Sequence, residues 1–315
     1  VPILRAKEKE DSSYHKFSQK CMGTDFVLLI DEKNSKEAKI AANKAFEEAH
    51  RLDKILSDYL SESELSKLSQ HSGIPQFFSL SSDLFSVLAR SQELAFATQG
   101  QFDITIGPLS RLWRIARFKK RLPSDEKLFN AHKRVGYKNL ILDYKQKKAK
   151  LLKVGMVLDL GGIAKGYAAD QMLKIFNKHN ISSVLIDAGG DLLVGDAPLG
   201  KKGWKITIGG KKHPDLPSLV LSNVAVATSG DLEQSVTIKD KTYSHLINPI
   251  TGLGLTTLSQ VTVIAPTAIR ADSLASATLV LGSAKGIQLL KDLPAVSAYF
   301  LEQKGNNIIL TQTAK

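Results

Sequence analysis

The chain has 315 residues, of which 43% are hydrophobic, so it can bury a substantial core as one elaborate domain or about two domains. Its 43 Lys and Arg outnumber its 31 Asp and Glu, and the net charge of +12 favours anionic partners. The basic clusters lack the interleaved aromatic residues and the zinc-ligand spacing of nucleic-acid-binding modules, so we expect no nucleic-acid partner. Solvated loops and a contact with a membrane surface or protein partner both remain open.

The N-terminal segment 1–20 is polar and aperiodic, and we expect it to be a tether, with one domain of two interleaved subdomains over 21–315. The chain opens with Val1 and shows no basic-then-apolar leader, which is typical of a mature or trimmed form. Cys21 is the one cysteine, so no intramolecular disulfide can form. A reactive thiol and a buried structural thiol both remain open.

Helical and extended patterns occur in blocks along the chain. We expect a strand at 24–30, a long amphipathic helix at 36–56, a short helix through 68 capped by Ser61 or Ser63, a helix at 82–98, a loop at 102–109 and a helix from 124 to 136. We then expect short strands over 139–160, a helix over 162–179, a buried strand at 184–187, antiparallel strands over 204–265, helices at 268–281 and 284–290, and two final strands. This arrangement in blocks predicts an α+β fold.

The segment from Asp159 to Asp170 reads as a strand end, a glycine turn and a helix start. Backbone N–H groups at such a helix start can face an anion, and Lys165 adds a positive charge. Neither standard phosphate-binding fingerprint fits the glycine spacing. A plain strand-to-helix connection with Lys165 in solvent is the alternative.

Asp272 and Ser276 lie four residues apart in a predicted helix, so their oxygens project from one face. Magnesium prefers hard oxygen ligands, with phosphate and water completing its octahedron. An Asp that merely opposes the helix dipole is the alternative.

His245 precedes a Pro and Thr-Gly turn on a predicted strand, and a histidine there suits a general base near neutral pH. A structural histidine, the more frequent case for a lone histidine, is the alternative. The segment 227–231 reads as a compact polar turn after an apolar strand. Such a turn either offers donors to a ligand or only makes a bend.

Together these segments resemble the FAD:protein FMN transferase family, also called ApbE or Ftp, in the same order and over roughly four fifths of the chain. The most specific pieces are Gly-Gly-Ile-Ala-Lys-Gly at 161–166 with its trailing Asp170, and Ala-Thr-Ser-Gly at 227–230. The resemblance implies an ApbE-like α+β fold, with antiparallel and mixed sheets, packed helices and an FAD cleft between two subdomains.

The resemblance also implies roles for single residues. The flavin nucleotide would be lined by Met22, Tyr59, Gln101, Phe102, Asp103, Asp159, Lys165, His245 and Ile247. Mg²⁺ would take the backbone oxygen of Ala164 and the side chains of Asp272 and Ser276. His245 and Lys165 would be catalytic. Ser276 stands where the family usually has Thr, and Asn248 where it commonly has Asp, which puts a carboxylate role at 248 in doubt.

The implied activity is the Mg²⁺-dependent transfer of FMN from FAD, through a phosphodiester bond, to a Ser or Thr hydroxyl of an electron-transport flavoprotein, with release of AMP. The same site could instead hydrolyse FAD to FMN and AMP, or the chain could be a non-catalytic flavin-binding lipoprotein. The family usually works in the periplasm, often as a lipoprotein anchored to the inner membrane.

Overall fold

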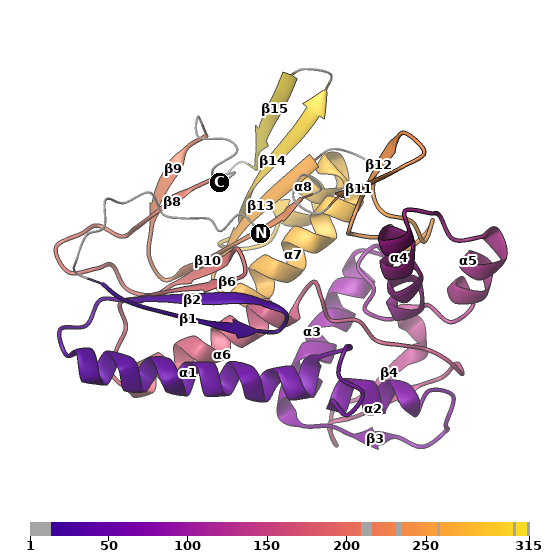
Figure 1. The fold of residues 1–315 in the computed structure, drawn as a ribbon, viewed down its shortest axis with the longest axis horizontal. Helices are drawn as coiled ribbons and strands as arrows, with labels where there is room; N and C mark the ends of the chain where they lie inside the picture. Colours follow the sequence, from indigo (N-terminus) through magenta and orange to yellow (C-terminus); the bar gives the residue numbers. More distant parts are fainter. Residues whose placement is uncertain (1–13, 209–215, 231–234, 257–258, 305–306, 314–315) are drawn as a thin grey trace.

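A sheet of eight antiparallel strands forms the centre of the protein in the computed structural model, which describes residues 14–208, 216–230, 235–256, 259–304 and 307–313 (Figure 1). Its order is β1-β2-β6-β7-β10-β13-β14-β15. The strands are β1 (His15–Cys21), β2 (Thr24–Ile30), β6 (Val184–Ala188), β7 (Asp191–Val194), β10 (Val224–Gly230), β13 (Ser259–Ala265), β14 (Ser297–Lys304) and β15 (Asn307–Gln312).

Three helices cover one face of this sheet: α1 (Ser35–Leu56), α6 (Ala164–Lys178) and α7 (Ala268–Leu281). The alternation of side chains along the strands explains this layering, because successive residues of a strand point to opposite faces. Phe26 and Leu28 of β2 belong to the main core under the helices. Leu29, between Leu28 and Ile30, packs instead on a second apolar cluster around Trp204 on the other face. The hairpin of β8 (Trp204–Thr207) and β9 (Ser218–Leu221) supplies part of that second cluster.

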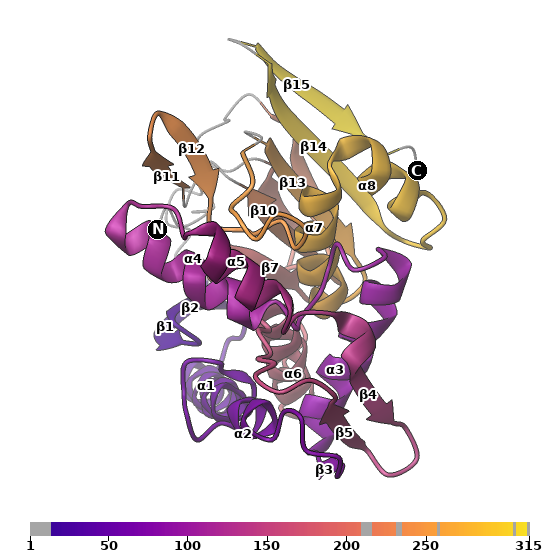
Figure 2. The ribbon, with the colours of Figure 1, turned by 90° about the vertical axis from the view of Figure 1, so that its right-hand side faces the viewer.

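The remaining elements lie mainly beyond one end of the helical layer (Figure 2). They are α2 (Glu64–Gln70), α3 (Ser82–Ala97), the small sheet of β3 (Phe78–Ser79), β5 (Lys148–Leu151) and β4 (Leu140–Asp143), α4 (Gly107–Lys119), α5 (Asp125–His132), a 3₁₀ turn (Tyr137–Asn139), the hairpin of β11 (Ser235–Ile238) and β12 (Lys241–Ser244), and α8 (Ser283–Lys291). Within the described ranges, no helix is long and apolar enough to cross a membrane.

The α+β fold class is confirmed, as are the long helices predicted at 36–56, 82–98 and 268–281. Ser63, one of two candidate caps, begins α2 by accepting a hydrogen bond from the Ser66 N–H (3.0 Å). The division of the chain into a tether and a domain with two interleaved subdomains stays a prediction. The boundary expected after residue 20 falls inside a strand. Residues 15–20 form β1, because pairing with β2 gives this polar segment backbone partners that its own pattern did not reveal.

Two further segments differ from the sequence-based expectation. The predicted loop at 102–109 ends earlier, because α4 begins at Gly107 with Pro108 in its first turn, where the missing N–H of proline costs nothing. Residues 227–230 of the predicted polar turn at 227–231 are the end of β10, whose residues pair with β13 from Ala225 to Gly230, and position 231 lies outside the described residues. Polar residues occur there because this end of the strand faces the candidate site described below.

Cys21 ends β1 with 3% of its surface exposed, and burial, with the Asp53 carboxylate adding to it, raises the pKa of its thiol to about 11. We therefore expect the thiol to react slowly with Ellman's reagent at pH 8 in the folded protein and rapidly in urea, because the thiolate is the nucleophile. The rate at which the absorbance of the released thiolate rises in each state measures this. Rapid reaction in the folded protein at pH 8 would instead identify Cys21 as a reactive thiol.

Candidate functional site

The close contact between α6 and α7 is the starting point of the candidate site. Gly166 faces α7 so tightly that a Cβ atom on it would lie 2.3 Å from the Ala268 carbonyl oxygen and 2.9 Å from Asp272 Cβ. Four residues further along α6, Asp170 accepts hydrogen bonds from the N–H groups of Ala268 (2.7 Å) and Ile269 (2.9 Å). This carboxylate caps the start of α7, where a helix has unpaired N–H groups. The two helices are thereby fixed at the residues that carry the site.

Asp272 and Ser276 both reach the glycine-rich start of α6. The Gly166 N–H donates to Asp272 Oδ2 (3.0 Å), and Ser276 Oγ lies 2.9 Å from where a Cβ on Gly162 would be. Both side chains are buried, with 3% and 7% of their surface exposed. Ala164, the third predicted metal ligand, is the first residue of α6 between these contacts. The structure thus brings the three predicted magnesium ligands to one place.

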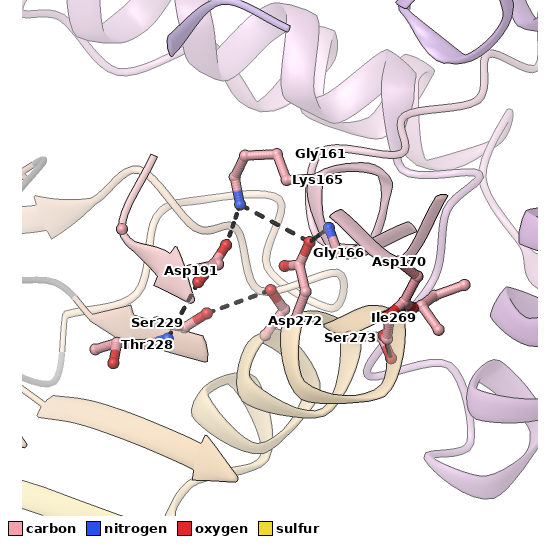
Figure 3. A network of polar contacts seen from close by, with 12 residues as sticks. Gly161, Lys165, Gly166, Asp170, Asp191, Thr228, Ser229, Ile269, Asp272 and Ser273 are labelled. Carbon is pink, nitrogen blue, oxygen red and sulfur yellow. Dashed lines mark hydrogen bonds and ion pairs between the residues drawn. The ribbon is translucent and has the colours of Figure 1, made fainter. Parts of the chain in front are cut away.

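Lys165 lies between two carboxylates in the same cluster (Figure 3). Its Nζ forms an ion pair with Asp191 of β7 and lies 3.8 Å from Asp272 Oδ2. A cation in the first turn of a helix is opposed by the helix dipole, so these carboxylates are needed to hold it there. Burial by itself lowers the pKa of Lys165, but the attraction of Asp191 and Asp272 outweighs it and the pKa is raised. Lys165 is therefore held by carboxylates rather than projecting into solvent, and its role toward an anion stays a prediction.

Asp191 is the residue of this cluster to which the sequence assigned no role. Its second oxygen, Oδ1, accepts a hydrogen bond from the Thr228 N–H of β10 (3.2 Å), and the neighbouring Ser229 Oγ lies 3.3 Å from Ser276 Oγ. The sheet therefore presents a row of polar groups to α7 at this point. The Asp-Ala-Gly-Gly-Asp segment at 187–191 could have indicated this role. A second carboxylate after a glycine turn is costly to bury without a partner, so it predicts a nearby cation.

Burial disfavours the ionised form of two carboxylates in this cluster. Burial raises the pKa of Asp272 to about 6, with Asp191 adding to the effect and Lys165 opposing it. Burial, with Asp191 adding to it, likewise raises the pKa of Asp187 to about 6. Each raised pKa means that the ionised carboxylate is disfavoured in its surroundings, and an additional cation would relieve this.

A second group of predicted residues is arranged around Arg114 of α4. Its guanidinium donates to Asp58 Oδ2 (2.6 Å) and to Asp159 Oδ2 (3.0 Å), and its Cζ lies 4.2 Å from the centre of the Tyr59 ring. Tyr59 is 76% exposed, so one face of the ring is available for stacking. Asp159 Oδ1 accepts a hydrogen bond from the Gly161 N–H (2.9 Å). Asp159 therefore connects the Arg114 group to the glycine turn before Lys165.

Phe102 and Asp103 lie beside the same turn, because the Asp159 N–H donates to the Ile104 carbonyl (2.8 Å). The Phe102 ring is buried and lies 3.6 Å from the Cβ position on Gly162. The Asp103 carboxylate accepts hydrogen bonds from the N–H and hydroxyl of Thr105 (2.8 and 2.7 Å) and from the Tyr137 N–H (2.9 Å). In this structure Asp103 therefore braces the loop, and its contact with the flavin nucleotide stays a prediction.

His245 directly follows β12 rather than lying within a strand. Its position is set by Ser244, whose carbonyl accepts a hydrogen bond from Trp113 Nε1 (2.9 Å). Ile247 packs with Trp113 in a small apolar cluster, so its side chain helps to hold this segment on α4. Trp113 and Arg114 are consecutive residues, and α4 therefore supports both the His245 segment and the Asp159 group.

The other predicted residues lie at turns. Met22, with φ of 50°, forms the β1–β2 turn with Gly23. This turn is at the same end of the sheet as the Gly189-Gly190 turn that leads to Asp191, because Phe26 pairs with Ala188. Gln101 lies half-buried in the turn after α3. The Asn248 side chain accepts hydrogen bonds from the N–H groups of Ile250 and Thr251 (2.8 and 3.4 Å), so an amide suffices for the turn that it closes.

Comparison with known proteins adds to this geometry. Residues 22–300 match the model of the ApbE family. The chain is 30% identical over 300 residues to the FAD:protein FMN transferase of Haemophilus influenzae. The alignment covers 91% of this chain and 86% of that protein. The corresponding protein of Treponema pallidum is 28% identical, with 87% and 80% covered.

Solved structures have the same fold. The ApbE protein of Thermotoga maritima superposes with a TM-score of 0.81 at 28% identity, over 94% of each chain. The flavin transferase ApbE of Vibrio cholerae gives a TM-score of 0.84 at 24% identity, over 96% of this chain and 97% of that one. Both comparisons confirm the predicted ApbE-like α+β fold.

The contact at Gly166 gives a test of this arrangement. We expect Gly166→Ala to lower the free energy of unfolding by about 1–3 kcal/mol, because the added methyl group would overpack the α6–α7 contact. The matched control is Gly161→Ala, whose nearest neighbour, Asp159 Oδ1, is 3.1 Å from the added Cβ. Urea denaturation of both variants measures the difference. An unchanged midpoint for Gly166→Ala would show that the two helices do not meet this closely.

Proposed function

This chain belongs to the ApbE family, and we propose that it is an FAD:protein FMN transferase. It takes the FMN half of FAD and attaches it through phosphate to a Ser or Thr hydroxyl of a flavin-accepting protein, releasing AMP. The names of its relatives support flavin transfer, and the site supports the more detailed parts of the proposal. The periplasmic location and lipid anchor implied by the resemblance stay predictions.

The charge balance around Lys165 is the observation that carries the proposal. Two carboxylates, those of Asp191 and Asp272, face the single ammonium group of Lys165. A pyrophosphate adds further negative charge and would be repelled by this cluster. The site therefore needs a cation before it can accept FAD, and the geometry of Asp272 and Ser276 at the start of α6 supports a place for one.

Mg²⁺ fits the donor set, because a carboxylate, a hydroxyl and a carbonyl are hard oxygen ligands. Asp272, Ser276 and the Ala164 carbonyl would hold it, and when bound it would neutralise the pyrophosphate and the charge that develops on the departing AMP. Among the residues that the structure describes, no three His, Cys, Asp or Glu side chains gather as a metal site. The remaining ligands would therefore be water and phosphate oxygens, as is usual for magnesium at nucleotide sites.

The protein's own groups would bind and orient the reactants. The exposed face of Tyr59 offers a stacking surface, and Arg114 fixes that ring next to Asp159. Lys165 holds the Asp272 carboxylate toward the start of α6. Such positioning and electrostatic complementarity supply most of the catalysis in phosphoryl transfer.

In the proposed reaction the acceptor hydroxyl oxygen bonds to the FMN phosphorus. The bond between that phosphorus and the bridging oxygen breaks, and AMP leaves with the electron pair. His245 takes the proton of the hydroxyl. The supporting observation is that α4 holds the His245 segment beside the Asp159 group, through Trp113 and Arg114.

Incubation with FAD, Mg²⁺ and a candidate flavin-carrier protein tests the function. We expect the carrier to gain the mass of one FMN, and excess EDTA to abolish the gain. Asp272→Asn should lower the rate by about 10²-fold or more, because it removes the metal carboxylate but keeps an acceptor for the Gly166 N–H. Glu93→Gln, on the exposed side of α3, is the matched control. Release of free FMN with no labelled carrier would identify a hydrolase instead.

His245→Ala tests the proposed base. We expect kcat for transfer to fall by about 10²–10⁴-fold while KM for FAD changes little, since a general base contributes that much to the reaction rate. His71→Ala, at the exposed end of α2, is the control. Near wild-type kcat for His245→Ala would mean that another group, or the phosphate itself, takes the proton.

A further inference from the structure

The outer face of α4 exposes apolar side chains that the fold does not use. Phe118 is 88% exposed and Ile115 is 54% exposed, although Trp113 and Ala116 on the inner face of the same helix are buried. Ile115 and Phe118 are three residues apart and therefore lie on one side of the helix. A solvent-exposed aromatic ring of this kind, with an aliphatic neighbour, is typical of a protein contact surface.

The same helix carries a concentrated positive charge. From Ile104 to Ser124 the chain contains no acidic residue. It contains six basic residues, Arg111, Arg114, Arg117, Lys119, Lys120 and Arg121. We call Ile115, Phe118, Lys119, Lys120 and Arg121 the α4 surface. Its partner must therefore be negatively charged, with an apolar group to cover Phe118.

The α4 surface adjoins the candidate site through α4 itself. Arg114, one helical turn before Phe118, bonds to Asp159 and underlies Tyr59, and Trp113 on the buried side of the helix holds the carbonyl of Ser244 next to His245. Figure 2 shows α4 and α5 in front of the helical layer, next to the β11–β12 hairpin that leads to His245. A partner on the α4 surface would thus contact the same helix that positions Asp159, Tyr59 and the His245 segment.

We infer that the α4 surface docks the flavin-accepting protein, through an acidic face of that protein that surrounds its target Ser or Thr. This inference rests on the proposed function. A transferase must hold a whole protein while one hydroxyl reaches the site, and the charge and apolar exposure next to His245 suit that task. An anionic membrane would meet the same charges, but it would not by itself bring a hydroxyl to the site.

Two variants test the inference in the flavinylation assay, with the same carrier protein. Phe118→Ser, and the double variant Lys119→Glu/Arg121→Glu, should each raise KM for the carrier at least about tenfold, since both remove interface anchors. KM for FAD should stay within about twofold of wild type. The rise of carrier KM with added salt should be steep for wild type and weak for the double variant, because salt screens exposed charges.

Matched controls keep the outcome interpretable. Leu199→Ser removes a side chain that is 78% exposed on a loop elsewhere. Lys36→Glu/Lys39→Glu makes the same change in net charge at the start of α1, at the opposite end of the molecule (Figure 1). Both controls should keep the wild-type KM for the carrier. Circular-dichroism melts check that all variants are folded.

The failures of the two proposals are distinguishable. A wild-type protein that transfers no FMN overturns the proposed function, and this inference with it. Normal transfer with wild-type carrier KM in both α4-surface variants overturns only the docking inference. Flotation with vesicles of phosphatidylcholine, with and without phosphatidylglycerol, tests whether the α4 surface binds an anionic membrane instead. If the variants lose vesicle binding while carrier KM is unchanged, the α4 surface contacts lipid and the inference is wrong.

Discussion

The contact of α6 with α7 is the constraint on which the candidate site depends. Gly166 allows the two backbones to approach, and Asp170 satisfies the first N–H groups of α7 so that this approach is stable. Only with the helices at this separation can Asp272 accept a hydrogen bond from α6 while Ser276 faces Gly162. A side chain at position 166 would separate the proposed metal ligands from the start of α6.

The electrostatics of the cluster follow from this packing. Bringing Asp272 and Asp191 to Lys165 excludes water from the carboxylates, and the raised pKa of Asp272 is the consequence. In a globular protein such a deficit of positive charge is costly unless binding makes use of it. The binding of a metal ion, which in turn binds phosphate, is one such use. It would account for two carboxylates sharing a single lysine.

The helix α4 has a different role, because it joins parts of the chain that are distant in sequence. Trp113 supports the His245 segment from 131 residues away, and Arg114 bridges Asp58 and Asp159. Trp113 and Arg114 thus assemble the proposed flavin side of the site, and the exposed side of the helix carries the basic residues and the Phe118 ring. One helix therefore links the proposed acceptor contact to the proposed catalytic groups.

The sequence by itself determined the α+β class, most helices and the family, because apolar periodicity and short glycine motifs are local properties of the chain. It also determined that Asp272 and Ser276 share a face, since they are one helical turn apart. Only the tertiary structure decided which carboxylates hold Lys165, that residues 15–20 become a strand, and that Arg114 joins Asp58 to Asp159. Each of these depends on partners brought from elsewhere in the chain, and no local pattern specifies the distance or direction of such a partner.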